Sequence, residues 1–303
     1  MSPRLSGNLT TQAAVVLWAT SFPVTEALLA GWHPLPLVAV RLAVSALSLT
    51  FMMVLAGQAG LLLRLPWRDI ALVGGLGLGT GTVFLVWGQD YSNPVTVAVI
   101  VTTLPLVSAA MGWALGQERV TAMIAIGVAC AIAGGILASL PPEGASLDFR
   151  GGEILAVGAV VLFTWYSRAS VIRLSGLPDL AKTAATMIAA AVVVSLAAAG
   201  AVAGGVVEAR YDLSLPSIGL LIWIGCVSNG ASMFLWLVGA RKLGVTIAAI
   251  HLNAVPFYVI LIALVLGGSL FYSQIWGACL VALGALLAQL PAFRRARRAA
   301  APD

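Results

Sequence analysis

The chain has 303 residues, of which 61% are hydrophobic and only 9% are charged, and its formal net charge is +5. Soluble domains carry about 25% charged residues, so a soluble fold of this length would leave much apolar surface in water. The same composition argues against intrinsic disorder and against a secreted disulfide scaffold. The sequence therefore predicts an all-α integral membrane protein.

A transmembrane helix needs about 20 apolar residues with few or no charges. Ten segments meet this condition, approximately at residues 11–29, 36–57, 70–89, 94–116, 121–140, 152–172, 180–201, 215–238, 246–267 and 272–290. The apolar runs are continuous rather than alternating, which excludes a β-barrel. Nine further runs follow the first, and no clear cleavage site ends it, so we expect a retained helix rather than a signal peptide.

The distribution of Lys and Arg predicts the orientation in the membrane. With the N-terminus in the cytoplasm, thirteen basic residues fall on the cytoplasmic side: Arg4, Arg64, Arg68, Arg119, Arg168, Arg173, Lys182, Arg241, Lys242, Arg294, Arg295, Arg297 and Arg298. Only Arg150 and Arg210 fall outside. We expect both termini to be cytoplasmic, in the inner membrane of a bacterium. The basic tail at 292–303 is expected to meet anionic lipid headgroups rather than nucleic acid.

The two halves of the chain repeat each other weakly but in a constant order. Shifting residues 84–116 by 151 positions matches Gly88 with Gly239, Ala98 with Ala249, Pro105 with Pro256, Leu115 with Leu266 and Gly116 with Gly267. Earlier in each half, segment 14–18 resembles segment 159–163. The repeat contains five helices, an odd number, so the second copy is predicted to have inverted topology. Such pairs are typical of secondary transporters, which bind substrate near the membrane midplane and work by alternating access.

Several motifs resemble the EamA-type permeases of the drug/metabolite transporter superfamily. They are the segment LWATSF at 17–22, Arg41, the segment TLPL at 103–106, the segment LGQER at 115–119, and Gly127 with Gly134. The resemblance covers roughly residues 10–290 and implies two EamA repeats, at 1–141 and 150–291, followed by the tail. It also implies export or exchange of small metabolites, amino acids among them. The cavity would be formed by helices one, three, four, six, eight and nine, with helices five and ten at the periphery.

Charged residues inside a membrane are costly, so each one needs a reason. Glu26 and Arg41 fall at similar depth on the first two predicted helices. We expect an ion pair that locks this hairpin, or two side chains that reach toward the membrane surface. The alternative is that Arg41 anchors a substrate carboxylate near an outer opening.

Two prolines, Pro105 and Pro256, stand at matching positions in the two halves, and each is expected to interrupt its helix. Polar residues precede them, namely Thr102, Thr103, His251 and Asn253. A broken helix flanked by polar groups in both halves predicts a substrate site. The alternative is kinked packing with these side chains bonded to local carbonyls. Titration of His251 would also make protons a candidate coupling ion.

Further candidates lie at mid-depth. Trp18 and Trp165 would supply an aromatic wall, while Thr80 and Asn229 would hydrogen-bond a substrate or a neighbouring helix. Ordinary core packing is the alternative for each of them.

The sequence therefore predicts a secondary transporter that exports small neutral or zwitterionic metabolites, most of all amino acids, with hydrophobic and aromatic ones favoured. Exchange of nucleotide sugars, sugar phosphates or drugs is the alternative, but phosphates would call for several intramembrane cations and only Arg41 is available. A membrane enzyme is a further alternative. The two histidines, His33 and His251, fall on opposite sides of the predicted bilayer, so we expect no catalytic dyad, metal site or cofactor.

Overall fold

The computed structural model describes residues 3–92, 94–116, 122–138, 151–267, 272–280, 282–284 and 287, and all regular elements in this part are helical. In chain order they are α1 (Pro3–Ala19), α2 (Ser21–Leu29), α3 (Pro34–Leu55), η1 (Ala59–Arg64), α4 (Trp67–Ile70), η2 (Ala71–Gly79), α5 (Thr80–Tyr91), α6 (Pro94–Val101), α7 (Leu104–Ala114), α8 (Ala122–Ala138), α9 (Gly152–Arg173), α10 (Asp179–Ala203), α11 (Leu215–Ile222), η3 (Trp223–Ala231), α12 (Ser232–Leu243), α13 (Val245–Ile250), η4 (His251–Ala254) and α14 (Val255–Val265).

Eight helical stretches are long and apolar enough to cross a membrane. They are Leu5–Leu29, Pro34–Leu55, Trp67–Tyr91, Pro94–Ala114, Gly152–Arg173, Asp179–Ala203, Leu215–Leu243 and Ile247–Val265. They coincide with the first four predicted spans and with the sixth to ninth. The fifth predicted span coincides with α8, of which 17 residues are described as helix. The tenth, 272–290, lies partly outside the described residues.

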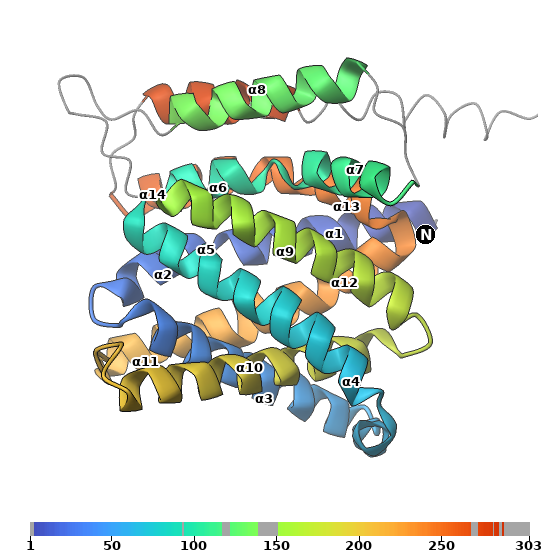
Figure 1. The fold of residues 1–303 in the computed structure, drawn as a ribbon, viewed down its shortest axis with the longest axis vertical. Helices are drawn as coiled ribbons and strands as arrows, with labels where there is room; N and C mark the ends of the chain where they lie inside the picture. The colour runs from blue at the N-terminus through green and yellow to red at the C-terminus, as the bar shows by residue number, and fades with distance from the viewer. Residues whose placement is uncertain are drawn as a thin grey trace, which may run out of the picture.

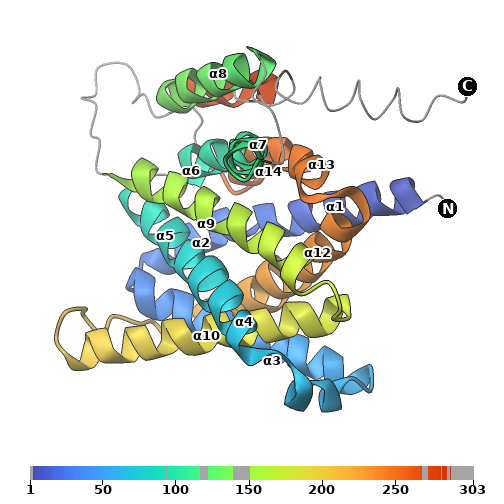
Figure 2. The same cartoon turned by 45° about the vertical axis from the view of Figure 1, so that its right-hand side comes forward.

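The long helices run side by side between two ends of the molecule (Figure 1). The N-terminus lies at one end, together with the connections from α9 to α10 and from α12 to α13. The connections from α2 to α3, from α5 to α6 and from α10 to α11 lie at the opposite end. We call these the N-terminal end and the opposite end. In Figures 1 and 2, α8 lies at one edge, beyond the layer formed by α6, α7 and α14.

Two kinds of helix interruption recur at nearly constant spacing. The π-helices η2 and η3 are nine residues long, start 152 residues apart, and each leads into a twelve-residue α-helix. Non-α segments precede α7 and α14, which start 151 residues apart and carry Pro105 and Pro256 in their first turns. Proline is tolerated in a first turn because the N–H it lacks has no helical acceptor there. The interruptions expected at both prolines are therefore confirmed.

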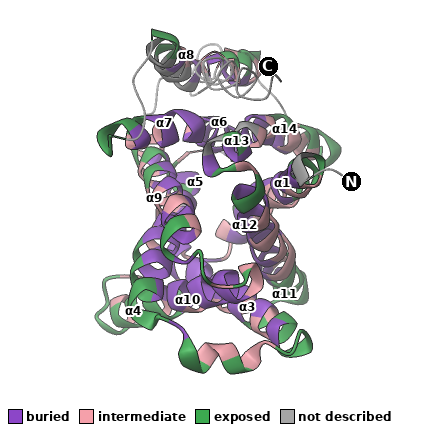
Figure 3. Cartoon of the chain, turned by 90° about the vertical axis from the view of Figure 1, so that its right-hand side faces the viewer, coloured by how far each residue is buried: buried purple, intermediate pink, exposed green. Residues whose placement is uncertain are grey.

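Small residues bring helices close together at matching places. A side chain at Gly88 of α5 would meet the backbone of Gly152 in α9, and one at Gly239 of α12 would overlap Thr11 of α1. Such contacts are typical of membrane proteins, where lipid gives no hydrophobic drive for helix association and packing must supply it. Buried residues face the interior of the ring of helices, and exposed residues lie mainly outside and at the ends (Figure 3). Large apolar side chains such as Leu47 and Leu196 are exposed, as a surface in contact with lipid requires.

Candidate functional site

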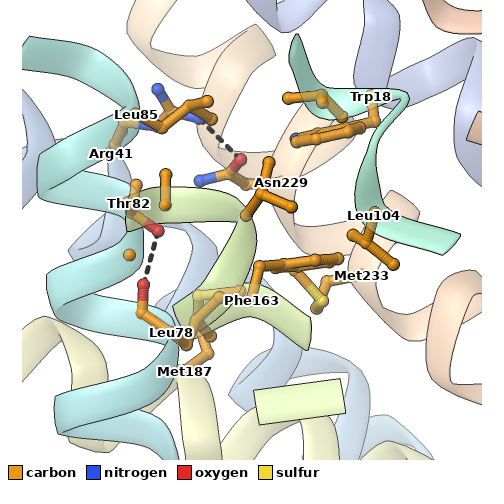
Figure 4. A pocket seen from close by; sticks show the side chains of 14 residues that line it. Trp18, Arg41, Leu78, Thr82, Leu85, Leu104, Phe163, Met187, Asn229 and Met233 are labelled. Atoms are coloured by element: carbon orange, nitrogen blue, oxygen red, sulfur yellow. Dashed lines mark hydrogen bonds between the residues drawn. The ribbon is translucent and has the colours of Figure 1, made fainter. Parts of the chain in front are cut away.

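A cavity of about 500 Å³ lies among α1, α3, η2, α5, α9, α10, η3 and α12, beside the interruption between α6 and α7 (Figure 4). Fourteen residues line it: Trp18, Arg41, Leu78, Gly81, Thr82, Leu85, Val101, Leu104, Ala159, Val160, Phe163, Met187, Asn229 and Met233. We call it the central cavity. Most of its wall is apolar, and its polar side chains, Arg41, Thr82 and Asn229, come from three different spans.

Arg41 is the charged residue of this wall. Its side chain is 1% exposed, although it stands seven residues inside α3. Its Nη2 donates a hydrogen bond to Oδ1 of Asn229 (2.8 Å), and its Nη1 donates one to the hydroxyl of Thr25 (3.2 Å). Its Nε has no partner. A guanidinium has five N–H groups, so the neutral partners of Arg41 occupy only part of its capacity.

The ion pair expected between Glu26 and Arg41 does not form, and that prediction is wrong. Thr25 and Glu26 are neighbours on α2, so their side chains point in directions about 100° apart. Thr25 is fully buried and accepts from Arg41, whereas Glu26 is exposed. The two residues match in depth but face different surroundings, which leaves the cation inside without a carboxylate.

Asn229 reaches the cavity from the π-helix η3. Short π-helical segments are frequent at functional sites, because the wider turn changes which side chains face inward. The hydroxyl groups of the neighbouring Ser228 and of Thr20 form a hydrogen bond (2.7 Å), in which either can be the donor. The hydroxyl of Thr20 also lies within hydrogen-bond distance of the carbonyl of Leu17. These contacts hold η3 against the junction of α1 and α2. The Nδ2 amide of Asn229 is left as a second donor beside Arg41.

Aromatic side chains form the other part of the wall. The rings of Trp18 and Phe163 are stacked, with centroids 5.8 Å apart and planes inclined by 8°. Phe163 also contacts the rings of Tyr166 at 5.9 Å and Trp236 at 5.8 Å. Trp18 and Phe163 are the last residues of the matched segments 14–18 and 159–163, so equivalent positions in the two halves meet face to face.

A second cavity of about 250 Å³ adjoins this aromatic pair on the side of the N-terminal end. Its lining consists of Ala14, Val15, Trp18, Phe163, Ser232, Met233, Trp236 and Leu252. Trp18, Phe163 and Met233 line both cavities. The stacked pair therefore stands between them as a partition.

The structure brings Trp18, Arg41 and Asn229 together but places other predicted site residues elsewhere. Thr80 is half-buried and absent from the lining, and Thr82 takes its place. Trp165 packs against Gly77, so the aromatic wall on α9 is Phe163 instead. In both cases the predicted residue lies two positions from the residue that lines the cavity. A step of two residues along an α-helix turns the side chain by about 200°.

The polar residues at the proline interruptions bond locally or stand apart from the central cavity. The hydroxyls of Thr102 and Thr103 donate to the carbonyls of Val99 and Ile100 at 2.6 and 2.7 Å. His251 is half-buried, with Nδ1 3.3 Å from the carbonyl of Ala248. Asn253 is buried, and neither of its amide atoms has a partner.

The neighbours of these polar residues line the cavities instead: Val101, Leu104 and Leu252. Sequence reasoning thus found the correct interruptions, but the side chains it named there lie outside both linings. It also missed the two methionines that complete the wall, Met187 and Met233, which carry no pattern that separates them from core residues. Among the described residues, no three His, Cys, Asp or Glu side chains form a group able to hold a metal ion.

The eight long apolar helices are those of a multi-pass helical membrane protein. Residues 5–140 match the EamA-like transporter family, so this part of the chain is similar to that family. The match agrees with the drug/metabolite transporter superfamily and indicates a membrane transporter.

Comparison with solved structures supports the fold over nearly the whole chain. Twenty-six solved chains match. One crystal structure of a protein is similar over 95% of this chain and 98% of its own, with a TM-score of 0.71 and 20% sequence identity. At this level of identity the similarity concerns the fold alone. No curated protein matches the sequence.

Proposed function

We propose that the protein is a secondary transporter that exports small metabolites carrying one carboxylate and an apolar or aromatic part. Hydrophobic and aromatic amino acids are the first substrate class to test. The observation that carries the proposal is Arg41, a buried cation in the wall of the central cavity with only neutral partners.

Burying an unpaired charge costs several kcal/mol, which a protein tolerates where the charge has a use. Guanidinium groups bind carboxylates through paired N–H donors, and Arg41 has donors to spare. The Nδ2 amide of Asn229 lies beside it as a further donor. These groups support an anion site at the polar end of the cavity.

The aromatic wall supports the second part of the substrate. Trp18 and Phe163 present ring faces and edges to the cavity, and aromatic pairs contribute about 0.5–1.5 kcal/mol beyond the burial of their area. A phosphorylated substrate fits less well, because Arg41 is the single cation that the described part of the chain brings to the lining.

We further infer that residues 1–141 and 150–291 are inverted copies that exchange two arrangements in alternating access. The paired π-helices, the paired proline interruptions and the meeting of Trp18 with Phe163 support this. Separation of the aromatic pair would join the two cavities and open the path toward the N-terminal end. We place that end in the cytoplasm, so the bacterial inner membrane is the proposed location.

The test is counterflow in proteoliposomes loaded with each member of an amino-acid panel, for the wild type and for Arg41→Gln. We expect saturable exchange of hydrophobic and aromatic members, reduced at least about tenfold in the variant, because a buried charge contact to a ligand contributes roughly 1.5–3 kcal/mol. Glu26→Gln is the control, since its side chain is exposed and unpaired with Arg41. Absence of exchange across the whole panel, or equal loss in both variants, would contradict the proposal.

A further inference from the structure

We infer that the central cavity selects monoanions over zwitterions: among carboxylates of one shape, it prefers those that carry no ammonium group. The inference rests on the proposed function and narrows its substrate class. It would place arylalkanoic, 2-hydroxy, 2-oxo and N-acylated amino acids ahead of free amino acids.

The wall of the central cavity carries a positive charge. Among the described residues, the lining of the central cavity contains one cation, Arg41, and no acidic residue. Both side chains that Arg41 bonds, Thr25 and Asn229, are neutral. The site therefore carries one positive charge before a ligand arrives.

The acidic residues of the described part of the chain lie away from the cavity wall. They are Glu26, Asp69, Asp90, Glu153, Asp179, Glu208 and Asp212. Glu26 faces outward, and the other six stand at or near the ends of their helices or in connections. Asp179 is in addition bonded to Arg241 at 2.8 Å and lies 3.4 Å from Lys182. None of them belongs to the lining, so none is placed to neutralise an ammonium group in the cavity.

The polar end of the cavity has more free hydrogen-bond donors than acceptors. Unused donors gather at the polar end, in the remaining N–H groups of Arg41 and in the Nδ2 amide of Asn229. Acceptors are scarce there, because Oδ1 of Asn229 already accepts from Arg41. The hydroxyl of Thr82 donates to the carbonyl of Leu78 at 2.7 Å, which leaves its oxygen as a neutral acceptor. An ammonium group brings three N–H donors and would find little to receive them.

Electrostatics then separates the two ligand classes. A monoanion leaves the filled cavity with no net charge, whereas a zwitterion leaves it with the charge of Arg41 and adds an ammonium group near that guanidinium. Charge interactions are stronger inside a protein than in water, so this difference is not screened away. A donor-rich site also suits the carbonyl of an N-acyl group, which accepts hydrogen bonds.

The experiment compares four probes that share one phenyl ring: 3-phenylpropanoate, N-acetyl-L-phenylalanine, L-phenylalanine and phenethylamine. Binding to the purified full-length protein is measured by calorimetry, and exchange is measured by counterflow. We expect both anions to bind at least about tenfold more tightly than L-phenylalanine, in line with measured couplings of close charge pairs, and phenethylamine not to bind.

The matched variant is Asn229→Asp, which keeps the shape of the side chain and places a carboxylate against Arg41. We expect it to weaken binding of 3-phenylpropanoate more than that of L-phenylalanine, so that the ratio of the two affinities falls at least about fivefold. Helix content and elution volume show whether the variant is folded. An unchanged ratio in a folded variant would overturn the inference.

The two proposals fail in different ways. If L-phenylalanine binds as tightly as 3-phenylpropanoate or more tightly, selection by charge is wrong, but transport of amino acids stands. If none of the three carboxylates binds or exchanges, the inference and the proposed substrate class fall together.

Discussion

At the scale of single residues, Trp18 and Phe163 have the most consequential position, because each lines both cavities. We expect Trp18→Ala and Phe163→Ala each to raise the KM for an aromatic substrate by up to about tenfold, from loss of an aromatic contact worth about 0.5–1.5 kcal/mol. Trp18→Phe should retain most of the affinity. The measurement is counterflow as a function of substrate concentration.

The control for this prediction is Trp113→Ala on α7, whose side chain is 57% exposed. It removes the same indole from a position outside both cavities, so the KM should not change. An equal rise in KM for Trp113→Ala and Trp18→Ala would show that the partition has no specific part in binding.

Residue-scale prediction from sequence succeeded where chemistry alone was informative. Arg41 and Asn229 stand out because polar groups within apolar spans need a reason. It failed where the orientation of a helix decides which residue lines the cavity, as it does for Phe163 instead of Trp165. A helix that is apolar on all sides gives no amphipathic pattern, so hydropathy cannot tell its inner face from its outer one. The predicted depth in the membrane was also not enough to predict an ion pair, since Glu26 and Arg41 match in depth but face different surroundings.

At the scale of elements, the two π-helices explain a second kind of error. In a π-helix, donor and acceptor are five residues apart along the chain, so a turn holds more residues than in an α-helix. A helix face that is predicted at 3.6 residues per turn is therefore displaced beyond a π-helix. η2 ends at Gly79, so the predicted inner face is already displaced at Thr80 and Thr82, which follow it. The spans and both proline interruptions were predictable from apolar length and proline placement. The sequence did not predict which side chains of this helix face inward beyond residue 71.

Gly239 allows a test of close packing between elements. A side chain at this position on α12 would overlap Thr11 of α1, whose hydroxyl donates to the carbonyl of Gly7. We expect Gly239→Val to destabilise the protein by about 1–3 kcal/mol, the usual cost of overpacking. Thermal unfolding in detergent, followed by circular dichroism, measures the loss.

Gly200→Val on α10 is the matched control, because nothing lies within 4 Å of a side chain placed there. It carries the same change of helix propensity without the overlap. Gly88→Val, the counterpart in the first half, should behave as Gly239→Val does because its side chain would meet Gly152. Equal unfolding temperatures for the variants at 239 and 200 would refute the close contact.

At the scale of the whole molecule, the proposed orientation in the membrane predicts on which side each chain terminus and each connection lies. In the proposed arrangement, each half has five helices, so the two copies enter the membrane from opposite sides, and ten spans return the chain to its starting side. A reporter that is active only in the cytoplasm, fused after Asp303, should therefore be active. A reporter inserted at Gly205, in the connection at the opposite end, should be inactive there and serves as the control. Activity with the reverse pattern would overturn the orientation.

The opposite end of the molecule is closed by contacts between the connection 204–214 and the turn 30–33. The N–H of His33 donates to the carbonyl of Arg210 (2.9 Å), and Nη2 of Arg210 donates to the carbonyl of Trp32 (3.1 Å). Nε1 of Trp32 donates to the carbonyl of Asp212 (3.0 Å). Because these contacts join a hairpin of each half, they must loosen if that end opens during transport.

His33 makes this closure sensitive to pH. Its Nδ1 accepts the N–H of Leu35 at 3.3 Å and so caps α3, a role that requires the neutral ring. Burial, followed by the nearby charge of Arg210, holds the pKa of His33 below its ordinary value of 6.5, against the opposing charges of Asp90 and Glu208. A base with a lowered pKa contributes stability above pH 6.5, and the contribution is lost as the pH falls from there through the lowered value.

We therefore expect acidification from pH 7.5 to 5 to lower the apparent Tm of the wild type more than that of His33→Asn. Asparagine also caps helices and does not titrate, so the variant keeps the cap and removes only the proton-dependent part. Thermal unfolding across this pH range measures the difference, with His251→Gln as a control that leaves the closure intact. A wild type and His33→Asn that lose the same number of degrees would exclude His33 as the group responsible. A larger loss in the wild type would assign this part of the pH-dependent stability to His33.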